Sequence, residues 1–286
     1  MINKPKMDER VEGADNPDDR GPGAAANPPA PPRRVNVLGV GLSAIDLDSA
    51  VAAMARAIET RTKGYICVTG GHGVSEAQSD PVFRTILNES FLNTPDGMPM
   101  VWMGRWQGFG GIRRVYGPDL MLRVCEYTHT RGLTHFFYGG AAGVAEDLKS
   151  RLEARFPGLK VAGTYSPPFR ALTEAEEADL GARVRAARPD IFWVGLSTPK
   201  QEKFMAQHWR GLDATLFVGV GAAFDFHAGR VRQAPRWMQR SGLEWLFRLG
   251  CEPRRLWKRY LKNNPLFILR ATLQLSGLRK YRLENT

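Results

Sequence analysis

The chain contains few cysteines and no long apolar run. Its three cysteines, Cys67, Cys125 and Cys251, are widely spaced and include no C-x-x-C pair. This pattern argues against a disulfide framework, a structural zinc site and a thioredoxin-like site, and it favours a reducing cytoplasm. No stretch of about 18 uninterrupted apolar residues is present, so we expect no transmembrane helix. The N-terminus has no basic start followed by an apolar core, so we expect no secretory signal.

Several nucleotide-binding patterns are also missing. No glycine-rich segment is followed by the Lys-Ser/Thr of a P-loop, and none fits G-x-G-x-x-G. A Tyr-x-x-x-Lys couple, which a nucleotide-sugar epimerase or oxidoreductase would need, is absent as well. The single D-x-D, Asp46-Leu-Asp48, opens an amphipathic segment, where helix capping explains it better than a metal site does. We therefore expect neither a metal ion nor a cofactor, and a leaving diphosphate would be stabilised by Arg, Lys and helix-terminal N–H groups.

Positive charge is concentrated near the C-terminus. The whole chain has 40 Lys and Arg against 29 Asp and Glu, a net charge of +11. Between Arg230 and Arg282 there are fourteen Lys or Arg and two acids, Glu244 and Glu252, so this segment alone carries +12 and the remainder −1. A basic module of this kind indicates an anionic partner, which can be a phosphate, a lipid headgroup or a nucleic acid.

Composition divides the chain into an N-terminal tail, a central core and a C-terminal appendage. Residues 1–32 contain seven prolines and almost no large apolar residues, which predicts a disordered tail. In residues 33–229, short apolar runs alternate with helix-period segments, and this favours an α/β domain with a mostly parallel, Rossmann-like sheet flanked by helices. The expected strands are 35–40, 65–68, 91–93, 134–138, 159–162, 191–195 and 215–220, and the expected helices are 47–58, 119–129, 143–156 and 175–187.

The third part, residues 230–286, is a basic appendage with three predicted helices, at 235–249, 253–261 and 266–278. Aromatic residues are interleaved with the basic ones: Trp237, Trp245, Trp257, Tyr260 and Phe267. Aromatic and cationic side chains together suit an anionic membrane surface, where rings lie at headgroup depth and cations meet lipid phosphates. The alternative interpretation is an amphipathic helical cap that packs these aromatic side chains into the core.

One strand end carries a candidate catalytic base. In Thr94-Pro-Asp-Gly97, Pro95 and Gly97 force a tight turn that projects Asp96 from the strand end. Ligands of parallel sheets bind beyond the carboxyl ends of the strands, so the side chain would face a ligand crevice. A carboxylate there can accept the proton of an attacking hydroxyl. An Asp-Gly turn that caps the next helix is the alternative interpretation.

Three further strand ends predict a donor-binding site in the same crevice. Two glycine turns, at 70–71 and 139–140, allow a phosphate to approach the backbone at a helix N-terminus, although tight strand-to-helix packing explains them equally well. The segment 199–202, Pro-Lys-Gln-Glu, opens a helix whose Lys would bind phosphate and whose Gln would bind a uracil edge or a sugar hydroxyl; a surface helix start would look similar. The predicted donor-binding residues are Thr69, Gly70, Gly139, Gly140, Gly195, Lys200 and Gln201.

Taken together, these motifs resemble the WecG/TagA/CpsF family of bacterial glycosyltransferases, over about residues 35–265. The segments that carry the resemblance are Ser79-Asp-Pro81, Thr94-Pro-Asp-Gly97, Arg114-Val-Tyr-Gly-Pro-Asp-Leu120, Pro199-Lys-Gln-Glu202, Gly219-Val-Gly-Ala-Ala-Phe-Asp-Phe226, Ala234-Pro-Arg-Trp-Met-Gln239 and Gly242-Leu-Glu-Trp245. One segment departs from the pattern: where the family usually shows Thr-x-Asn, this chain has Thr69-Gly-Gly71 and lacks the Asn amide that would contact the sugar.

The resemblance implies transfer, with inversion, from a UDP-sugar to an undecaprenyl-diphosphate-linked saccharide in cell-surface polysaccharide synthesis. The donor of the family is typically UDP-N-acetylmannosamine, and related members use glucose. The resemblance also implies that Asp96 is the base and that Arg114 and Gln201 belong to the site. Three arginines of the appendage would face the lipid diphosphate: Arg248, Arg255 and Arg259.

The sequence therefore predicts a metal-independent glycosyltransferase that moves N-acetylmannosamine or another hexose. Its partners would be a UDP-sugar donor, a polyprenyl-diphosphate-linked acceptor and the anionic inner face of the plasma membrane, where the cytoplasmic protein would be peripheral and could form a homo-oligomer. The alternative is an α/β protein that binds nucleic acid or a nucleotide-sugar without transferring anything. A nucleic-acid partner is not expected, since it would leave Pro-Asp-Gly and the glycine turns without a role.

Overall fold

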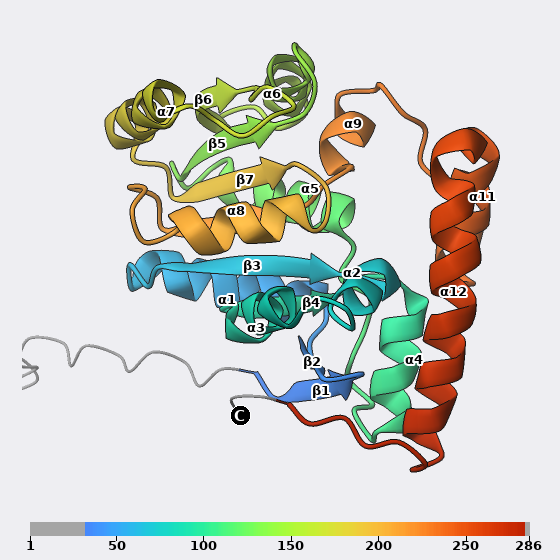
Figure 1. Cartoon of the computed structure of the whole chain (residues 1–286). Coiled ribbons are helices and arrows are strands. Elements are labelled where there is room, and N and C mark those ends of the chain that lie inside the picture. The colour runs from blue at the N-terminus through green and yellow to red at the C-terminus, as the bar shows by residue number, and fades with distance from the viewer. Residues whose placement is uncertain (1–31, 284–286) are drawn as a thin grey trace, which may run out of the picture.

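A computed structural model describes residues 32–283, without the side chains of Arg255 and Arg259 (Figure 1). A six-stranded, wholly parallel sheet lies at its centre, in the order β4-β3-β8-β7-β5-β6, which confirms the expected α/β class. The predicted disordered tail, apart from Pro32, lies outside the described residues. In chain order the strands are β3 (Gly64–Thr69), β4 (Leu92–Pro95), β5 (Thr134–Gly139), β6 (Lys160–Tyr165), β7 (Ile191–Gly195) and β8 (Leu216–Gly219).

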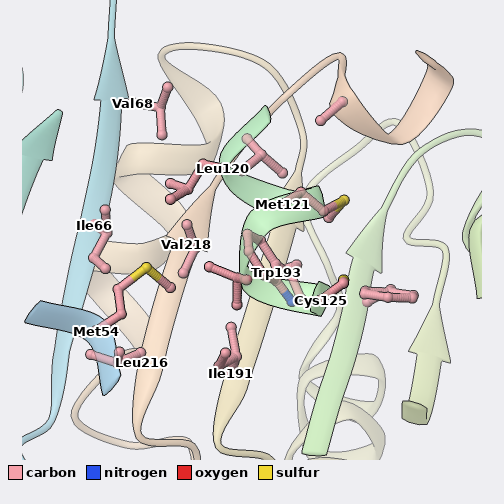
Figure 2. Packing of buried hydrophobic residues seen from close by; sticks show 14 of the residues in the cluster. Met54, Ile66, Val68, Leu120, Met121, Cys125, Ile191, Trp193, Leu216 and Val218 are labelled. Atoms are coloured by element: carbon pink, nitrogen blue, oxygen red, sulfur yellow. The ribbon is translucent and has the colours of Figure 1, made fainter. Parts of the chain in front are cut away.

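Helices cover both faces of this sheet because alternate side chains of each strand point to opposite sides. Ile191 and Trp193 of β7 belong to one hydrophobic cluster, and Phe192 and Val194 belong to the other. Figure 2 shows the first cluster, in which side chains from β3, β7 and β8 meet side chains of two helices. Helices on that face are α1 (Leu47–Glu59), α5 (Gly117–Thr128), α6 (Val144–Arg155) and α9 (Ala223–His227); on the other face lie α2 (Gly71–Glu76), α3 (Pro81–Glu89), α4 (Met98–Trp106), α7 (Glu174–Ala187) and α8 (Lys200–His208).

Two helix starts follow from local side-chain chemistry. Asp46 caps α1, since its carboxylate accepts a hydrogen bond of 2.9 Å from the backbone N–H of Ser49. Asp48 pairs with Arg123 of α5. Thr173 and Glu176 form a capping box at the start of α7, where each side chain accepts a hydrogen bond from the other's backbone N–H. The helix-capping role expected for the Asp46-Leu-Asp48 segment is confirmed at Asp46.

A buried chain of hydrogen bonds ties β7 to β5 and α5. Trp193 Nε1 donates to His135 Nδ1 at 2.9 Å, and His135 Nε2 lies 2.8 Å from Thr128 Oγ1. An indole N–H can only donate, so Nδ1 is the acceptor and Nε2 carries the proton that it gives to Thr128. Burial lowers the pKa of His135 to about 4, which keeps the ring neutral. Every polar atom of this chain is therefore satisfied inside the core.

The first apolar run differs from the expected single strand at 35–40. It is a two-stranded antiparallel hairpin of β1 (Arg34–Val37) and β2 (Val40–Ser43), separate from the parallel sheet. Leu38 and Gly39 both have positive φ, at 55° and 84°. Two successive residues of this kind make the type of tight turn that reverses a strand. The apolar run conceals the turn because β2 is buried at every position and β1 buries Val35 and Val37.

The C-terminal helices also differ from the expected three segments. They are α10 (Arg236–Arg240), α11 (Glu244–Cys251) and α12 (Pro253–Leu275). Gly242, at φ 76°, separates α10 from α11 inside the segment expected as one helix. In contrast, α12 continues through Pro265, because Leu256 before it and Phe267 after it are buried, and this packing outweighs the missing backbone N–H (Figure 1).

The far end of α12 reaches the β1–β2 hairpin. Gln274 accepts a hydrogen bond of 2.9 Å from the backbone N–H of Leu38 and donates one of 2.8 Å to the carbonyl of Asn36. The helix also packs along α2 and α4, as Figure 1 shows. Within residues 32–283 no helix combines the length and apolarity needed to cross a membrane.

Candidate active site

One large cavity, of about 910 Å³, opens at the carboxyl ends of the parallel strands. Its wall includes residues that directly follow or end β3, β4, β5, β7 and β8, so the strand ends singled out in the sequence meet here. The C-terminal helices complete the wall with Trp245, Arg248 and Tyr260. Eight of the site residues predicted from the sequence line this cavity: Gly70, Asp96, Arg114, Gly140, Gly195, Lys200, Gln201 and Arg248.

The Asp96 carboxyl group projects from the turn after β4 into this cavity. Its backbone N–H donates to the carbonyl of Thr69 at 2.9 Å, and this bond holds the turn against the end of β3. A Cβ on Gly70 would lie 2.9 Å from the Asp96 carbonyl oxygen, so only glycine permits this approach. The Asp96 side chain is 30% exposed, whereas its Oδ1 is buried, makes no hydrogen bond within the described residues and lies 3.5 Å from Arg114 Nη2. The exposed part of the side chain can therefore be reached from the cavity.

Burial raises the pKa of Asp96 to about 6, and three neighbouring charges modify that effect. Arg114 opposes it, Glu244 adds to it, and Arg248 opposes it. A carboxyl group with a pKa near 6 is ionised at neutral pH yet remains more basic than an ordinary aspartate. This combination suits a general base, whose best pKa lies near the working pH.

Beside Asp96, Arg114 lies in a network that joins the core to α11. Its Nη2 is 3.5 Å from Asp96 Oδ1 and forms a close ion pair with Glu244 Oε2. Tyr116 Oη donates to the other oxygen of Glu244 at 2.9 Å, and the Arg114 guanidinium lies over the Tyr116 ring, 3.9 Å from its centroid. Burial, then Glu244 and Asp96, raise the pKa of Tyr116 and keep its hydroxyl protonated. Sequence reasoning missed Glu244 and Tyr116, although both stand in motifs that carried the resemblance.

The residues of the two predicted glycine turns have different roles: some pack strands together, and others line the cavity. A Cβ on Gly139, which has a φ of 129°, would lie 2.6 Å from the Gly195 carbonyl oxygen, so close contact of β5 and β7 explains this residue. Gly139 and Thr69 do not line the cavity, and Thr69 is 2% exposed with a buried Oγ1 that has no hydrogen-bond partner in the described structure. Gly70 and Gly140 do line it.

At the start of α8 lie the predicted Lys200 and Gln201. Gln201 is only 3% exposed, and its Nε2 donates to Glu202 Oε1 at 3.0 Å while its Oε1 is buried and unpaired in the described structure. Thr198 Oγ1 donates to the same Glu202 oxygen at 2.8 Å. Burial raises the pKa of Glu202, which is 1% exposed. Gln201 is therefore part of the cavity wall, and its acceptor oxygen is buried without a hydrogen-bond partner among the described residues.

A second wall of the cavity is aromatic, and sequence reasoning did not find it. Tyr138 of β5 stacks on Phe204 of α8 with ring centroids 4.4 Å apart, and the His208 ring lies 4.5 Å from Phe204. All three line the cavity, together with Phe169, which is 90% exposed. No local pattern joins these residues, because strand, loop and helix bring them together. Flat apolar faces of this kind suit a nucleobase.

The remaining residues singled out in the sequence are two arginines of α12 and two histidines. The side chains of Arg255 and Arg259, both on α12, lie outside the described structure. His72 lines the cavity, 3.3 Å from Asn263 of α12. His227 Nε2 lies 3.0 Å from the Pro118 carbonyl oxygen, and burial lowers its pKa. Across residues 32–283, no three His, Cys, Asp or Glu side chains gather as ligands for a metal ion.

Comparison with known proteins gives consistent matches over most of the chain. Residues 35–281 match the family model described as "Glycosyl transferase WecG/TagA/CpsF family". An N-acetylglucosaminyldiphosphoundecaprenol N-acetyl-beta-D-mannosaminyltransferase of Bacillus spizizenii (strain W23) is 29% identical over 220 residues, 75% of this chain and 83% of that protein. The protein of the same name from Bacillus subtilis (strain 168) is 31% identical over 186 residues, 65% of this chain and 70% of that protein.

Proposed function

The chain belongs to the WecG/TagA/CpsF family of glycosyl transferases, and from this premise we propose that it transfers N-acetylmannosamine or another hexose from a UDP-sugar to an undecaprenyl-diphosphate-linked saccharide, with inversion. The observation that carries the proposal is the Asp96 carboxylate, which projects into a cavity of about 910 Å³ beside Arg114 and whose side chain is 30% exposed. The cavity volume is within the range that holds a nucleotide-sized ligand.

In the proposed reaction Asp96 removes the proton of the acceptor hydroxyl. The freed oxygen forms a bond to the anomeric carbon of the donor sugar, and the bond from that carbon to the diphosphate breaks with its electron pair leaving on UDP. One displacement inverts the anomeric centre, and no covalent sugar–enzyme intermediate forms. The raised pKa of Asp96 supports this role, because a stronger base takes the proton more readily.

The cavity wall offers groups for each part of a UDP-sugar. Lys200, Arg114 and Arg248 can balance the charge of the departing diphosphate, and the backbone at Gly70 and Gly140 can approach it closely. The half-buried ring of Phe204, which stacks on Tyr138, can lie beside the uracil. The free Oε1 of Gln201 can accept a hydrogen bond from the base or from a sugar hydroxyl.

The lipid-linked acceptor is proposed from the names of the two Bacillus relatives, and the C-terminal helices support it. These helices expose large apolar side chains within the segment that carries +12: Trp237, Trp257, Leu261 and Ile268 are 48–70% exposed. We propose that they dock on the anionic inner face of the plasma membrane and leave Arg248 facing the diphosphate. Vesicles of anionic lipid should bind the protein, vesicles of neutral lipid should bind it weakly, and salt should reverse the binding.

The decisive experiment offers the purified protein a panel of UDP-sugars with an undecaprenyl-diphosphate-linked N-acetylglucosamine acceptor and weighs the product. The proposal predicts a mass gain of one sugar, a fixed and inverted anomeric configuration, and a rate that EDTA leaves nearly unchanged. No product with any UDP-sugar, together with salt-sensitive DNA binding and no affinity for UDP, would favour the nucleic-acid alternative. Complete loss with EDTA that magnesium restores would contradict metal independence.

A further inference from the structure

Glu244 lies on α11, among the C-terminal helices, yet both of its carboxylate oxygens contact residues of the core. Oε2 forms a close ion pair with Arg114 Nη2, and Oε1 accepts the hydrogen bond of 2.9 Å from Tyr116 Oη. The Glu244 side chain is 18% exposed and the Arg114 side chain 13%. A charged pair this far from solvent, held at both oxygens, is a defined contact and not a mobile surface ion pair.

Arg114 is held from several directions, and Asp96 is only one of its contacts. Its Nη2 is 3.5 Å from Asp96 Oδ1, a longer distance than the contact of the same nitrogen with Glu244. Its Nη1 lies 3.4 Å from Gln239 Oε1, another residue of the C-terminal helices. The guanidinium rests on the Tyr116 ring. Glu244 therefore draws Arg114 into a position where it neighbours Asp96 without forming a tight pair with it.

This geometry matters because a tight ion pair with Arg114 would weaken Asp96 as a base. An arginine that binds a carboxylate in close contact stabilises the ionised form and lowers its proton affinity. If Glu244 takes the tight contact, Arg114 stays close enough to bind an anionic leaving group, and Asp96 keeps its basicity. The Arg114 guanidinium is thus in close contact with the Glu244 carboxylate and in longer contact with the Asp96 carboxylate.

We propose that Glu244 is a positioning residue for the transfer reaction: it holds the Arg114 guanidinium next to Asp96 and, as a second negative charge, preserves the basicity of Asp96. The inference rests on the proposed function of Asp96 as the base. Because Glu244 is borne by α11, the charges around Asp96 are complete only when the C-terminal helices are docked on the core. Through the Glu244 side chain, docking of the C-terminal helices thereby affects the ability of Asp96 to accept a proton.

The groups that face Asp96 come from each element around it. Arg114 and Tyr116 precede α5, Glu244 and Arg248 lie one turn apart on α11, and His72 of α2 lines the same cavity. Arg248 lowers the pKa of Asp96 and Glu244 raises it. Replacement of Glu244 by a neutral residue leaves both arginines without the opposing charge, so the proton affinity of Asp96 should fall.

The first test is the pH dependence of kcat/KM for Glu244→Gln in the full-length chain. The amide keeps the shape and can still accept the Tyr116 hydrogen bond. We expect the acidic limb of the profile to move down by roughly one pH unit, the size that one nearby charge produces, and kcat on the plateau to fall roughly 10-fold. Glu244→Asp keeps the charge and should restore the position of the limb. Glu153→Gln, which removes a surface carboxylate 3.9 Å from Lys149, should change neither quantity.

The second test does not depend on turnover, so it also decides the inference if the proposed transfer activity fails. Carbon-13 labelled aspartate carboxyl groups are titrated by NMR, and the Asp96 signal is identified by its absence in Asp96→Asn. In the wild-type protein this signal should titrate near pH 6, and in Glu244→Gln it should titrate at lower pH. An unchanged titration of Asp96 in Glu244→Gln would overturn the inference, as would a fall in kcat with the acidic limb in its wild-type place.

Discussion

The α/β core and the C-terminal helices differ in how much of their surface is buried and in their net charge. Strands β3, β4 and β8 are buried at every position, and β7 at all but its last. In contrast, α10 and α11 bury no residue, and the buried residues of α12 among its described side chains are Leu256, Phe267 and Ala271. The net charge is −1 outside Arg230–Arg282 and +12 inside it. Hydrophobic burial thus holds the core together, whereas polar contacts contribute much of the docking of the C-terminal helices.

The candidate active-site cavity lies where these two regions meet, and each supplies a different part of it. The core provides the carboxylate and the glycine turns, whose positions depend on a rigid sheet. The C-terminal helices provide Glu244, Trp245, Arg248 and Tyr260. Changes in the core should therefore appear mainly as changes in stability, unless they touch the cavity. Changes in the C-terminal helices should appear mainly as changes in activity.

The largest expected effect comes from a core residue that does touch the cavity. Asp96→Asn should lower kcat by about 10³-fold, because the amide cannot take the acceptor's proton. UDP affinity and Tm should stay close to wild-type values, since Oδ1 makes no hydrogen bond in the described structure. Isothermal titration and a radiolabelled-sugar assay measure the two quantities. Asp213→Asn, an exposed aspartate outside the cavity wall, is the matched control.

Removal of the whole second region should have the next largest effect. A chain truncated after Gly229 should lose about 100-fold or more in kcat/KM, because Arg248 and Glu244 no longer complete the site. The core should remain folded, with a cooperative unfolding transition at a somewhat lower Tm, since α12 covers α2, α4 and the β1–β2 hairpin. Full activity of the truncated chain would show that the C-terminal helices are dispensable.

A paired tryptophan substitution compares the two regions directly. Trp193→Phe removes the donor to buried His135 Nδ1 and should cost about 1–3 kcal/mol in the free energy of unfolding. Trp257→Phe on α12, where the ring is 48% exposed, should change that free energy by less than about 0.5 kcal/mol. Urea unfolding monitored by circular dichroism gives both values. Equal costs would contradict the distinction between a buried core and a lightly packed appendage.

The smallest expected effect concerns the buried Glu202. Its pKa is raised in the folded state, so as pH rises above the usual 4.5 the unfolded chain releases this proton first and the folded state loses relative stability. Glu202→Gln lacks this loss and should be more stable than wild type by about 1 kcal/mol at pH 8, with little difference at pH 4. Urea unfolding at the two pH values checks the sign. Glu153→Gln, at a partly exposed surface position, should show no such dependence on pH.

The sequence predicted the parts of this molecule that depend on local patterns. Apolar runs bounded by turn residues located all six strands of the parallel sheet. The inner strands β3, β7 and β8 need such a run because they are buried on both faces. The Pro-Asp-Gly turn predicted the projection of Asp96, because Pro95 and Gly97 restrict the backbone on either side of it. The helix expected at 175–187 is α7, which starts one residue earlier, at Glu174.

Features that depend on distant contacts could not be predicted in this way. The β1–β2 hairpin is hidden in one apolar run, and the course of α12 through Pro265 depends on packing against the core. The ion pair of Arg114 with Glu244 joins residues 130 positions apart. The stacked rings of Tyr138 and Phe204 come from a strand and a helix on either side of a long connection. No spacing rule encodes such pairs, since the fold alone brings them together.

The pH dependence of kcat/KM in the wild-type chain tests the central role of Asp96 most directly. Only the ionised carboxylate can accept the proton, so kcat/KM should rise with pH through about 6 and then level off. The residual rate of Asp96→Asn should lack this acidic limb. A wild-type profile that stays flat from about pH 4.5 to 8, or a limb that persists unchanged in Asp96→Asn, would contradict the account.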